Sequence, residues 1–440
     1  MIATRLTKLP FASDRIWIWL LAAFSLAPLA WCRNDFAGLF YFGDEWDQLD
    51  QISTRGFASW VWSVFGENFA PMFKLTWGGV ALASGGSYFA LVVIVWLAHA
   101  GCVGLLGCWM RVVGFGRAGT AIAMIGLGLP ATNVETLGWT IQLITVQGVL
   151  FFLAAGCWQA IRDRAESWNG RSLAILGLLV TLSTFSFVRG PLTGAALATA
   201  ALFPLLGGRG AWRNWRTRAK VAGVCLLPAV AAFVITVKFS PGNHLRLEEI
   251  GLIPPLNYAA WYFLMNPFHR LFDVSTFGPY TAGLLGVVKL AVLALGWKLA
   301  APSQRRLLAA LLVFELGNTL LLGLGRYHTG LGTATGSRYQ YFALLSTLPF
   351  VGVCLDATLQ RLARFKGARP IAAAAALLTL AIVAAEPWAR SMRNWSETRG
   401  RNTRHTLFTD PNPPPTGVLP GISFMTTEKA KDLIARYHLH

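Results

Sequence analysis

The sequence predicts an all-α protein that crosses a membrane about eleven times, and three observations support this fold class. First, 55% of the 440 residues are hydrophobic and only 13% are charged, whereas a soluble domain carries about a quarter charged residues. Second, apolar runs long enough to cross a bilayer as helices recur along the chain. Third, these runs lack the period-two alternation of barrel strands. Backbone groups must be paired inside lipid, so we expect helices.

The expected spans set the domain organisation. A transmembrane domain over residues 1–387 is followed by a short tail, 388–440, and the longest outer connections are residues 33–87 and 240–280. The eleven spans are residues 16–32, 88–110, 118–131, 139–160, 171–188, 191–207, 221–239, 279–297, 307–325, 339–357 and 370–387.

The distribution of basic residues predicts the orientation. The net charge of +18 could suggest nucleic acid, but 20 of the 38 bases lie in six short segments on one side of the expected spans. Positive loops stay in the cytoplasm, so the N-terminus is expected there and the tail outside it. No compact basic domain remains to bind nucleic acid. We expect a multi-pass protein of a bacterial inner membrane.

The scarce acidic residues gather in one outer stretch. Residues 41–51 read YFGDEWDQLDQ, with four carboxylates within seven residues, although the chain has only 20 acids. Gly43 breaks the chain, and Asp44 is expected to cap a short helix on which Asp44, Asp47 and Asp50 share one face. One interpretation is an amphipathic helix on the membrane surface, with Trp46 and Leu49 toward lipid.

The electrostatic repulsion within such a cluster of carboxylates favours a functional interpretation. Like charges on one short face repel each other unless a cation, a metal ion or a substrate meets them. Partial desolvation and like-charged neighbours also raise a carboxyl pKa, which suits a general base.

Several stretches, taken in order, resemble the C-type (GT-C) integral-membrane glycosyltransferases, the superfamily of bacterial arabinose, mannose and glucose transferases. The resemblance touches about 120 residues, and FVRGP at residues 187–191 departs from it, where many relatives have a Ser-Lys-Glu turn. The matching stretches are FYFGDEW after the first helix, ENFAPMFKLTWGG at 67–79, the helix at 87–106 with His99, residues 129–155 with Pro130, Glu135 and Trp139, and SRYQYFALLSTLPFV at 337–351.

This resemblance implies an inverting transferase that uses a polyprenyl-phosphate-linked sugar on the periplasmic side. Asp44 is implied as the base, with Glu45 as second choice. Asp47 and Asp50 would orient the acceptor or bind a divalent cation, as in some relatives, and no other cofactor is expected. The acceptor would be an envelope glycan, a lipid or a surface protein.

Positive charge near the departing phosphate should stabilise the transition state. Arg326 and Arg338 bracket a glycine-rich outer loop, RYHTGLGTATGSR, whose amides could approach a phosphate. Lys74, Arg338, Arg326 and His328 are therefore the candidate phosphate ligands. The alternative is a flexible turn with arginines that extend to the interface.

Two further features concern the outer surface and the membrane interior. Four prolines disfavour one straight helix over 240–280, so we expect short interfacial helices, as a lid or a re-entrant hairpin. Lys289 and Glu315 fall at the same expected depth and should form an ion pair. The alternative is a polar relay in a transporter or flippase for a lipid-linked sugar. The tail would either close over the outer face or act as a tether.

Overall fold

The computed structural model describes residues 15–64, 69–187, 189–204, 214–239, 251–362, 388, 390–409 and 425–439. In this part of the chain all regular elements are helices and no β-strand occurs. Six of the described helices are long and apolar enough to cross a membrane, judged by length and composition. The predicted class, an all-α polytopic membrane protein, is confirmed.

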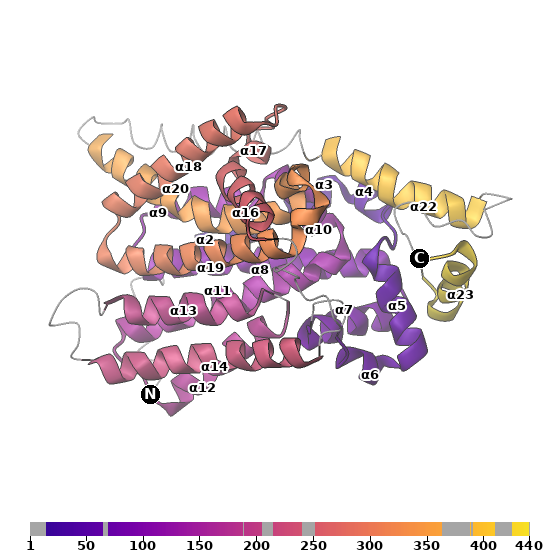
Figure 1. Cartoon of the computed structure of the whole chain (residues 1–440), viewed down its shortest axis with the longest axis horizontal. Helices are drawn as coiled ribbons and strands as arrows, with labels where there is room; N and C mark the ends of the chain where they lie inside the picture. Colours follow the sequence, from indigo (N-terminus) through magenta and orange to yellow (C-terminus); the bar gives the residue numbers. More distant parts are fainter. Residues whose placement is uncertain are drawn as a thin grey trace.

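The long helices run side by side as a bundle (Figure 1). Ten of the eleven expected spans coincide with helices, and the eleventh, 370–387, lies outside the described residues. The first span is split at Ser25–Leu26, because Pro28 opens the second piece and cannot donate to the preceding turn. The helices are α2 (Arg15–Phe24), α3 (Ala27–Trp31), α8 (Tyr88–Val112), α9 (Arg117–Gly128), α11 (Leu143–Arg164), α12 (Gly170–Thr184), α13 (Pro191–Leu202), α14 (Trp215–Phe239), α18 (Pro279–Leu299), α19 (Pro302–Arg326) and α20 (Gln340–Leu362).

Small residues let α9 and α20 approach closely. A Cβ on Gly352 would lie 2.6 Å from the carbonyl oxygen of Gly119, so only glycine allows this crossing. Asp356 of α20 accepts hydrogen bonds from the Gly116 and Gly119 amides at 2.7 and 2.9 Å. It thereby satisfies orphan donors at the start of α9. This packing joins the second half of α20 to the start of α9.

Short helices gather at one end of the bundle, which we call the site end. The first outer loop folds into α4 (Arg33–Ala37), α5 (Asp44–Arg55), α6 (Phe57–Val61) and α7 (Pro71–Ala83). Figure 1 shows α5, α6 and α7 beside α23 (Thr427–Tyr437) at this end. The other outer elements are α10 (Val134–Gly138), α16 (Ile253–Met265), α17 (Phe268–Leu271) and the 3-10 turns η1 (Ala131–Asn133), η2 (Thr140–Gln142), η5 (Tyr327–Thr329), η6 (Leu331–Thr335) and η7 (Ser337–Tyr339).

The helix α16 does not form a free lid. Tyr258, Tyr262 and Met265 are fully buried, and α16 packs on α18 and α19. Residues 240–250, the first part of the expected interfacial segment, lie outside the described residues. The described part of this segment is therefore a packed support.

Candidate active site

The acidic helix begins one residue earlier than the capping prediction requires. Gly43 takes the cap position with φ 61°, and no side chain caps α5, so the prediction that Asp44 caps it is wrong. The turn is set by Trp139, which donates to the Phe42 carbonyl at 3.1 Å and would lie 3.1 Å from a Cβ on Gly43. Only a residue without a side chain fits this positive φ beside the indole. Asp44 is thus the first residue of α5.

Glu45 lies inside the protein and anchors the turn. Its side chain is 0% exposed. It accepts hydrogen bonds from the Phe42 amide at 2.7 Å, the Tyr88 hydroxyl at 3.2 Å, the Ile141 amide at 3.2 Å and the Thr140 hydroxyl. Burial raises the pKa of Glu45 to about 8, although these donors pull it down. Trp46 and Leu49 are also 0% exposed, so they face protein and not lipid.

Asp44 has the opposite environment. It is half-buried, and no donor among the described residues is bonded to its carboxylate. Burial raises the pKa of Asp44, and the positive charges of Arg338 and Arg326 lower it in part. A carboxylate that is partly desolvated, faced by cations and free of bonded donors can accept a proton.

Arg338 is held in place by Glu135. The two side chains form an ion pair at 3.7 Å. The Glu135 carboxylate also accepts from the Arg338 amide at 3.1 Å and from the Ser337 hydroxyl at 3.3 Å. The Arg338 guanidinium lies 5.1 Å from the Tyr339 ring centroid. One third of the Arg338 side chain stays exposed, so its remaining donors can reach a ligand.

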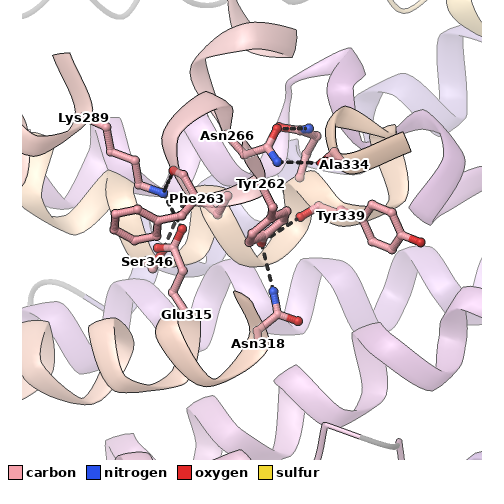
Figure 2. Close-up of polar contacts among 11 residues, drawn as sticks. Tyr262, Phe263, Asn266, Lys289, Glu315, Asn318, Ala334, Tyr339 and Ser346 are labelled. Carbon is pink, nitrogen blue, oxygen red and sulfur yellow. Dashed lines mark hydrogen bonds and ion pairs between the residues drawn. The ribbon is translucent and has the colours of Figure 1, made fainter. Parts of the chain in front are cut away.

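Side chains of α16 and of the segment after it donate hydrogen bonds to the glycine-rich loop before Arg338 and to Tyr339. The Asn266 amide donates to the Ala334 carbonyl and the Arg270 side chain to the Thr335 carbonyl, both at 2.9 Å. The Tyr262 hydroxyl donates to the Tyr339 carbonyl at 3.3 Å and accepts from Asn318 at 2.9 Å (Figure 2). The buried Asn266 and Tyr262 and the exposed Arg270 thus donate to three carbonyl groups of residues 334–339.

Arg326 and His328, two other predicted phosphate ligands, differ in their relation to Asp44. Arg326 ends α19 and is exposed, yet its charge acts on Asp44. His328 is exposed and packs edge-on against Tyr327, with no described contact to Asp44 or Arg338.

Lys74 is only 2% exposed. Its ammonium donates to the Trp60 carbonyl, the Ser63 carbonyl and the Ser63 hydroxyl at 2.8, 2.8 and 2.9 Å. All three ammonium hydrogens are used, which leaves none for a phosphate. Burial lowers the pKa of Lys74 to about 8.

Two further arginines lie in this region: the sequence indicated Arg189 only as one of the cations on the same side as the acids, and Arg399 was not singled out. Arg189, in the FVRGP stretch, lies 5.1 Å from the Phe342 ring and 5.9 Å from the Tyr339 ring, and its charge interacts with Arg326 and Arg338. Arg399, from the tail, lies 4.0 Å from the Phe42 ring. Burial lowers the pKa of Arg399, while the charge of Glu135 raises it. The arginine of FVRGP was visible in the sequence, but no local signal joins the tail to the first loop.

Asp47 and Asp50 do not meet at a metal site. Among the described residues no group of three or more His, Cys, Asp or Glu could hold a metal ion. Asp47 accepts from Gln51 at 3.2 Å, and burial raises its pKa. Asp50 pairs with Lys429 of α23 at 2.7 Å. No step of the reaction is assigned to a divalent cation.

The intramembrane charges lie away from Asp44, in the bundle. Lys289 and Glu315 form an ion pair, and both side chains are 0% exposed. Lys289 also donates to the Phe263 carbonyl at 2.9 Å, and Ser346 donates to Glu315 (Figure 2). His99 is similarly enclosed in α8, with Tyr341 at 2.9 Å and the Gly128 carbonyl at 3.2 Å. In the described part of the chain, these groups form two separate buried clusters.

The fold and its apolar helices define a polytopic α-helical membrane protein. No protein-family model and no curated protein matches the chain. Among solved structures, it is similar to an oligosaccharyltransferase from Archaeoglobus fulgidus, crystallised in complex with zinc and sulfate, at 14% identity and a TM-score of 0.49. The match covers 88% of this chain and 55% of the neighbour, so this chain spans about half the neighbour's length. At this level of likeness, an activity for this chain has to be argued from its own side chains.

Proposed function

We propose that the protein is an inverting membrane glycosyltransferase that moves a sugar from a polyprenyl-phosphate donor to an envelope glycan, lipid or surface-protein acceptor outside the cytoplasm. One observation carries the proposal. Asp44 presents a half-buried carboxylate with no bonded donor among the described residues, and the charges of Arg338 and Arg326 act on it. The sequence resemblance described above supports the same residue as the base.

The reaction needs a base on one side of the anomeric carbon and cations on the other. The acceptor oxygen attacks this carbon, its proton passes to the Asp44 carboxylate, and the bond to the phosphate oxygen breaks. The electron pair stays on the leaving polyprenyl phosphate, which is already a stable anion and needs no strong acid. Arg338 and Arg326 would stabilise the negative charge, since the guanidinium fork matches phosphate oxygens.

The neighbouring Glu45 suits a different role. Its full burial keeps an acceptor hydroxyl away from it, and its bonds from Phe42 and Ile141 fix the backbone around Asp44. Glu135 orients Arg338 by accepting from its side chain and its amide. Arg189 adds a third positive charge near Arg326 and Arg338. We therefore assign Asp44 as base, the three arginines as phosphate ligands, and Glu45 and Glu135 as their supports.

The test uses purified full-length protein in lipid nanodiscs with a panel of defined polyprenyl-phosphate sugars and envelope acceptors. Transfer is followed by mass spectrometry of the acceptor. We expect Asp44→Asn to lower the transfer rate about 10²- to 10⁴-fold, the usual contribution of a general base. Asp432→Asn, a change at an exposed carboxylate of α23, is the matched control and should keep the wild-type rate.

Two results would contradict the proposal. One is undiminished transfer by Asp44→Asn. The other is a wild-type protein that carries the intact donor across the bilayer without breaking the bond between sugar and phosphate, as the transporter alternative requires.

A further inference from the structure

Residues 390–409 of the tail pack against the first outer loop. Residues 390–409, which we call the C-terminal strap, run beside α4 (Figure 1). A Cβ on Gly400 of the strap would overlap the Gly38 carbonyl oxygen, so the two backbones touch. On the strap and just before it, Trp388, Met392, Ser396 and Thr403 are at most 1% exposed. Trp388 and residues 390–409 of the tail therefore pack tightly and do not form a loose tether.

Arg399 and Arg404 of the strap lie over aromatic rings of the segment that leads into α5. Residues 39–42 form no helix. Arg399 lies 4.0 Å from the Phe42 ring and Arg404 lies 5.2 Å from the Phe40 ring, while Tyr41 donates to the Gly86 carbonyl at 3.1 Å. Guanidinium groups at these distances from a ring face are attracted to it.

The strap changes helix type between the two arginines. Residues Glu397–Arg401 and His405–Thr409 form π-helix, separated by the short α22 (Asn402–Arg404). Arg399 lies in the first π-helical piece and Arg404 in α22, and the rings that they approach, Phe42 and Phe40, are two residues apart in the chain.

A second attachment holds α5 further along. Lys429 of α23 pairs with Asp50 at 2.7 Å, and Arg436 donates to the Ser53 hydroxyl. The other side of α23 is apolar, with Ala430 and Leu433 at most 1% exposed. A partly exposed ion pair contributes little free energy by itself, so the apolar side supplies the attachment and the pair sets its register.

We propose that Arg399 and Arg404 are positioning residues: they fix residues 39–42 so that the Asp44 carboxylate faces Arg338 and Arg326. The catalytic part of this inference rests on the proposed function, but the mechanical part does not. Asp44 follows Phe42 by only two residues, with the Gly43 turn between them. A guanidinium bound to the Phe42 ring therefore limits the directions in which the Asp44 side chain can point.

The mechanical part is tested by hydrogen exchange on the full-length protein in nanodiscs. In the double variant Arg399→Ala, Arg404→Ala we expect the amides of residues 39–55 to exchange roughly tenfold faster, since each lost contact loosens the same segment. The double lysine variant keeps two cations over the rings and should restore most of the protection. Arg393→Ala, at an exposed arginine of the same strap, is the control and should leave exchange unchanged.

The outcomes separate this inference from the proposed function. Unchanged exchange over residues 39–55 in the double alanine variant overturns it, whatever the activity. A variant that fails to fold is recognised by faster exchange throughout the bundle, and then the single variants Phe40→Leu and Phe42→Leu decide in the same way.

The transfer activity of the same variants gives a second, independent test of the positioning role. If wild type transfers sugar, the double alanine variant should lower kcat with little change in KM for the donor, and the lysine variant should recover it. Equal kcat in wild type and the alanine variant contradicts a positioning role. Faster local exchange with no transfer by wild type would leave the strap in place and remove the transferase proposal.

Discussion

Two parts of the molecule set carboxylates against cations, and they do it in opposite ways. In the bundle, Glu315 is fully buried and meets both Lys289 and Ser346. At the site end, Asp44 is half-buried, feels the charges of Arg338 and Arg326, and has no bonded donor among the described residues. The first arrangement is complete within the protein. The second lacks a partner that a substrate can supply.

The same difference separates two neighbours in the sequence. Glu45 is surrounded by four donors, whereas Asp44 beside it is bonded to none of the described donors. Satisfied buried charges are usual for a structural role, and an unsatisfied one is a candidate for function. The following predictions test whether this distinction holds, in order of decreasing effect.

Breaking the intramembrane pair should have the largest effect on stability. Lys289→Met leaves the Glu315 carboxylate buried without its cation, and we expect the protein to lose about 3–5 kcal/mol of stability. The double variant Lys289→Met, Glu315→Met should recover much of this loss because no buried charge remains. Thermal unfolding in detergent measures both. If the double variant stays as unstable as the single one, the loss of stability does not come from the unpaired Glu315 charge.

Removing a site cation should change activity more than stability. Arg338→Ala is expected to lower transfer about a hundredfold, as loss of one preorganised charge does. Because Arg338 lowers the pKa of Asp44, its removal should raise that pKa. A base works only when deprotonated, so the acid limb of the rate profile should move to higher pH. Arg338→Lys keeps the charge and should shift this limb less. An unshifted limb in the alanine variant would separate Asp44 from the cation.

Lys74 tests the comparison between charges bound within the protein and charges open to a substrate, because the sequence analysis named it as a phosphate ligand. Lys74→Met should cost about 1–3 kcal/mol of stability, since Trp60 and Ser63 lose a buried donor. KM for the donor should remain unchanged if the ammonium holds only protein oxygens. A large rise in KM without loss of stability would return Lys74 to the phosphate site. Lys431→Met, at an exposed position of α23, is the control.

The smallest effect concerns the pH dependence of stability. The pKa of Glu45 is raised from 4.5 to about 8, so between these values the folded protein binds a proton that the unfolded chain releases. Stability should therefore fall as pH rises through this window. In Glu45→Gln this part of the dependence should disappear. Chemical denaturation from pH 5 to 8 compares the two proteins, and an identical slope would show that Glu45 is ionised throughout.

Local sequence patterns predicted the helices well and the contacts among them unevenly. Apolar length is a property of each segment alone, and this is why ten spans coincide with helices. Lys289 and Glu315 could be related because both stand equally far from one turn, and the structure places them in contact. The outer elements are shorter and depend on packing. Residues 240–280 were expected as short interfacial helices, with a lid as one option and a re-entrant hairpin as the alternative, whereas the buried Tyr258 and Tyr262 pack α16 against the bundle.

The site shows the same limit. Asp44 and Glu45 look alike in sequence, and only Tyr88, Thr140 and Ile141, which come from later segments, distinguish their environments. Lys74 looked like a free cation because the carbonyls that bind it carry no sequence signal. Arg399 lies more than 350 residues from Phe42, and nothing local relates the two. Such long-range pairings are set by tertiary packing alone.

The strap has a consequence for biosynthesis. The first loop leaves the ribosome hundreds of residues before Arg399 and Arg404 are made, so the turn at Gly43 emerges without its two guanidinium contacts. The acidic helix of a nascent chain is therefore made before the residues that secure it. A chain that stops before residue 390 would lack both guanidinium contacts.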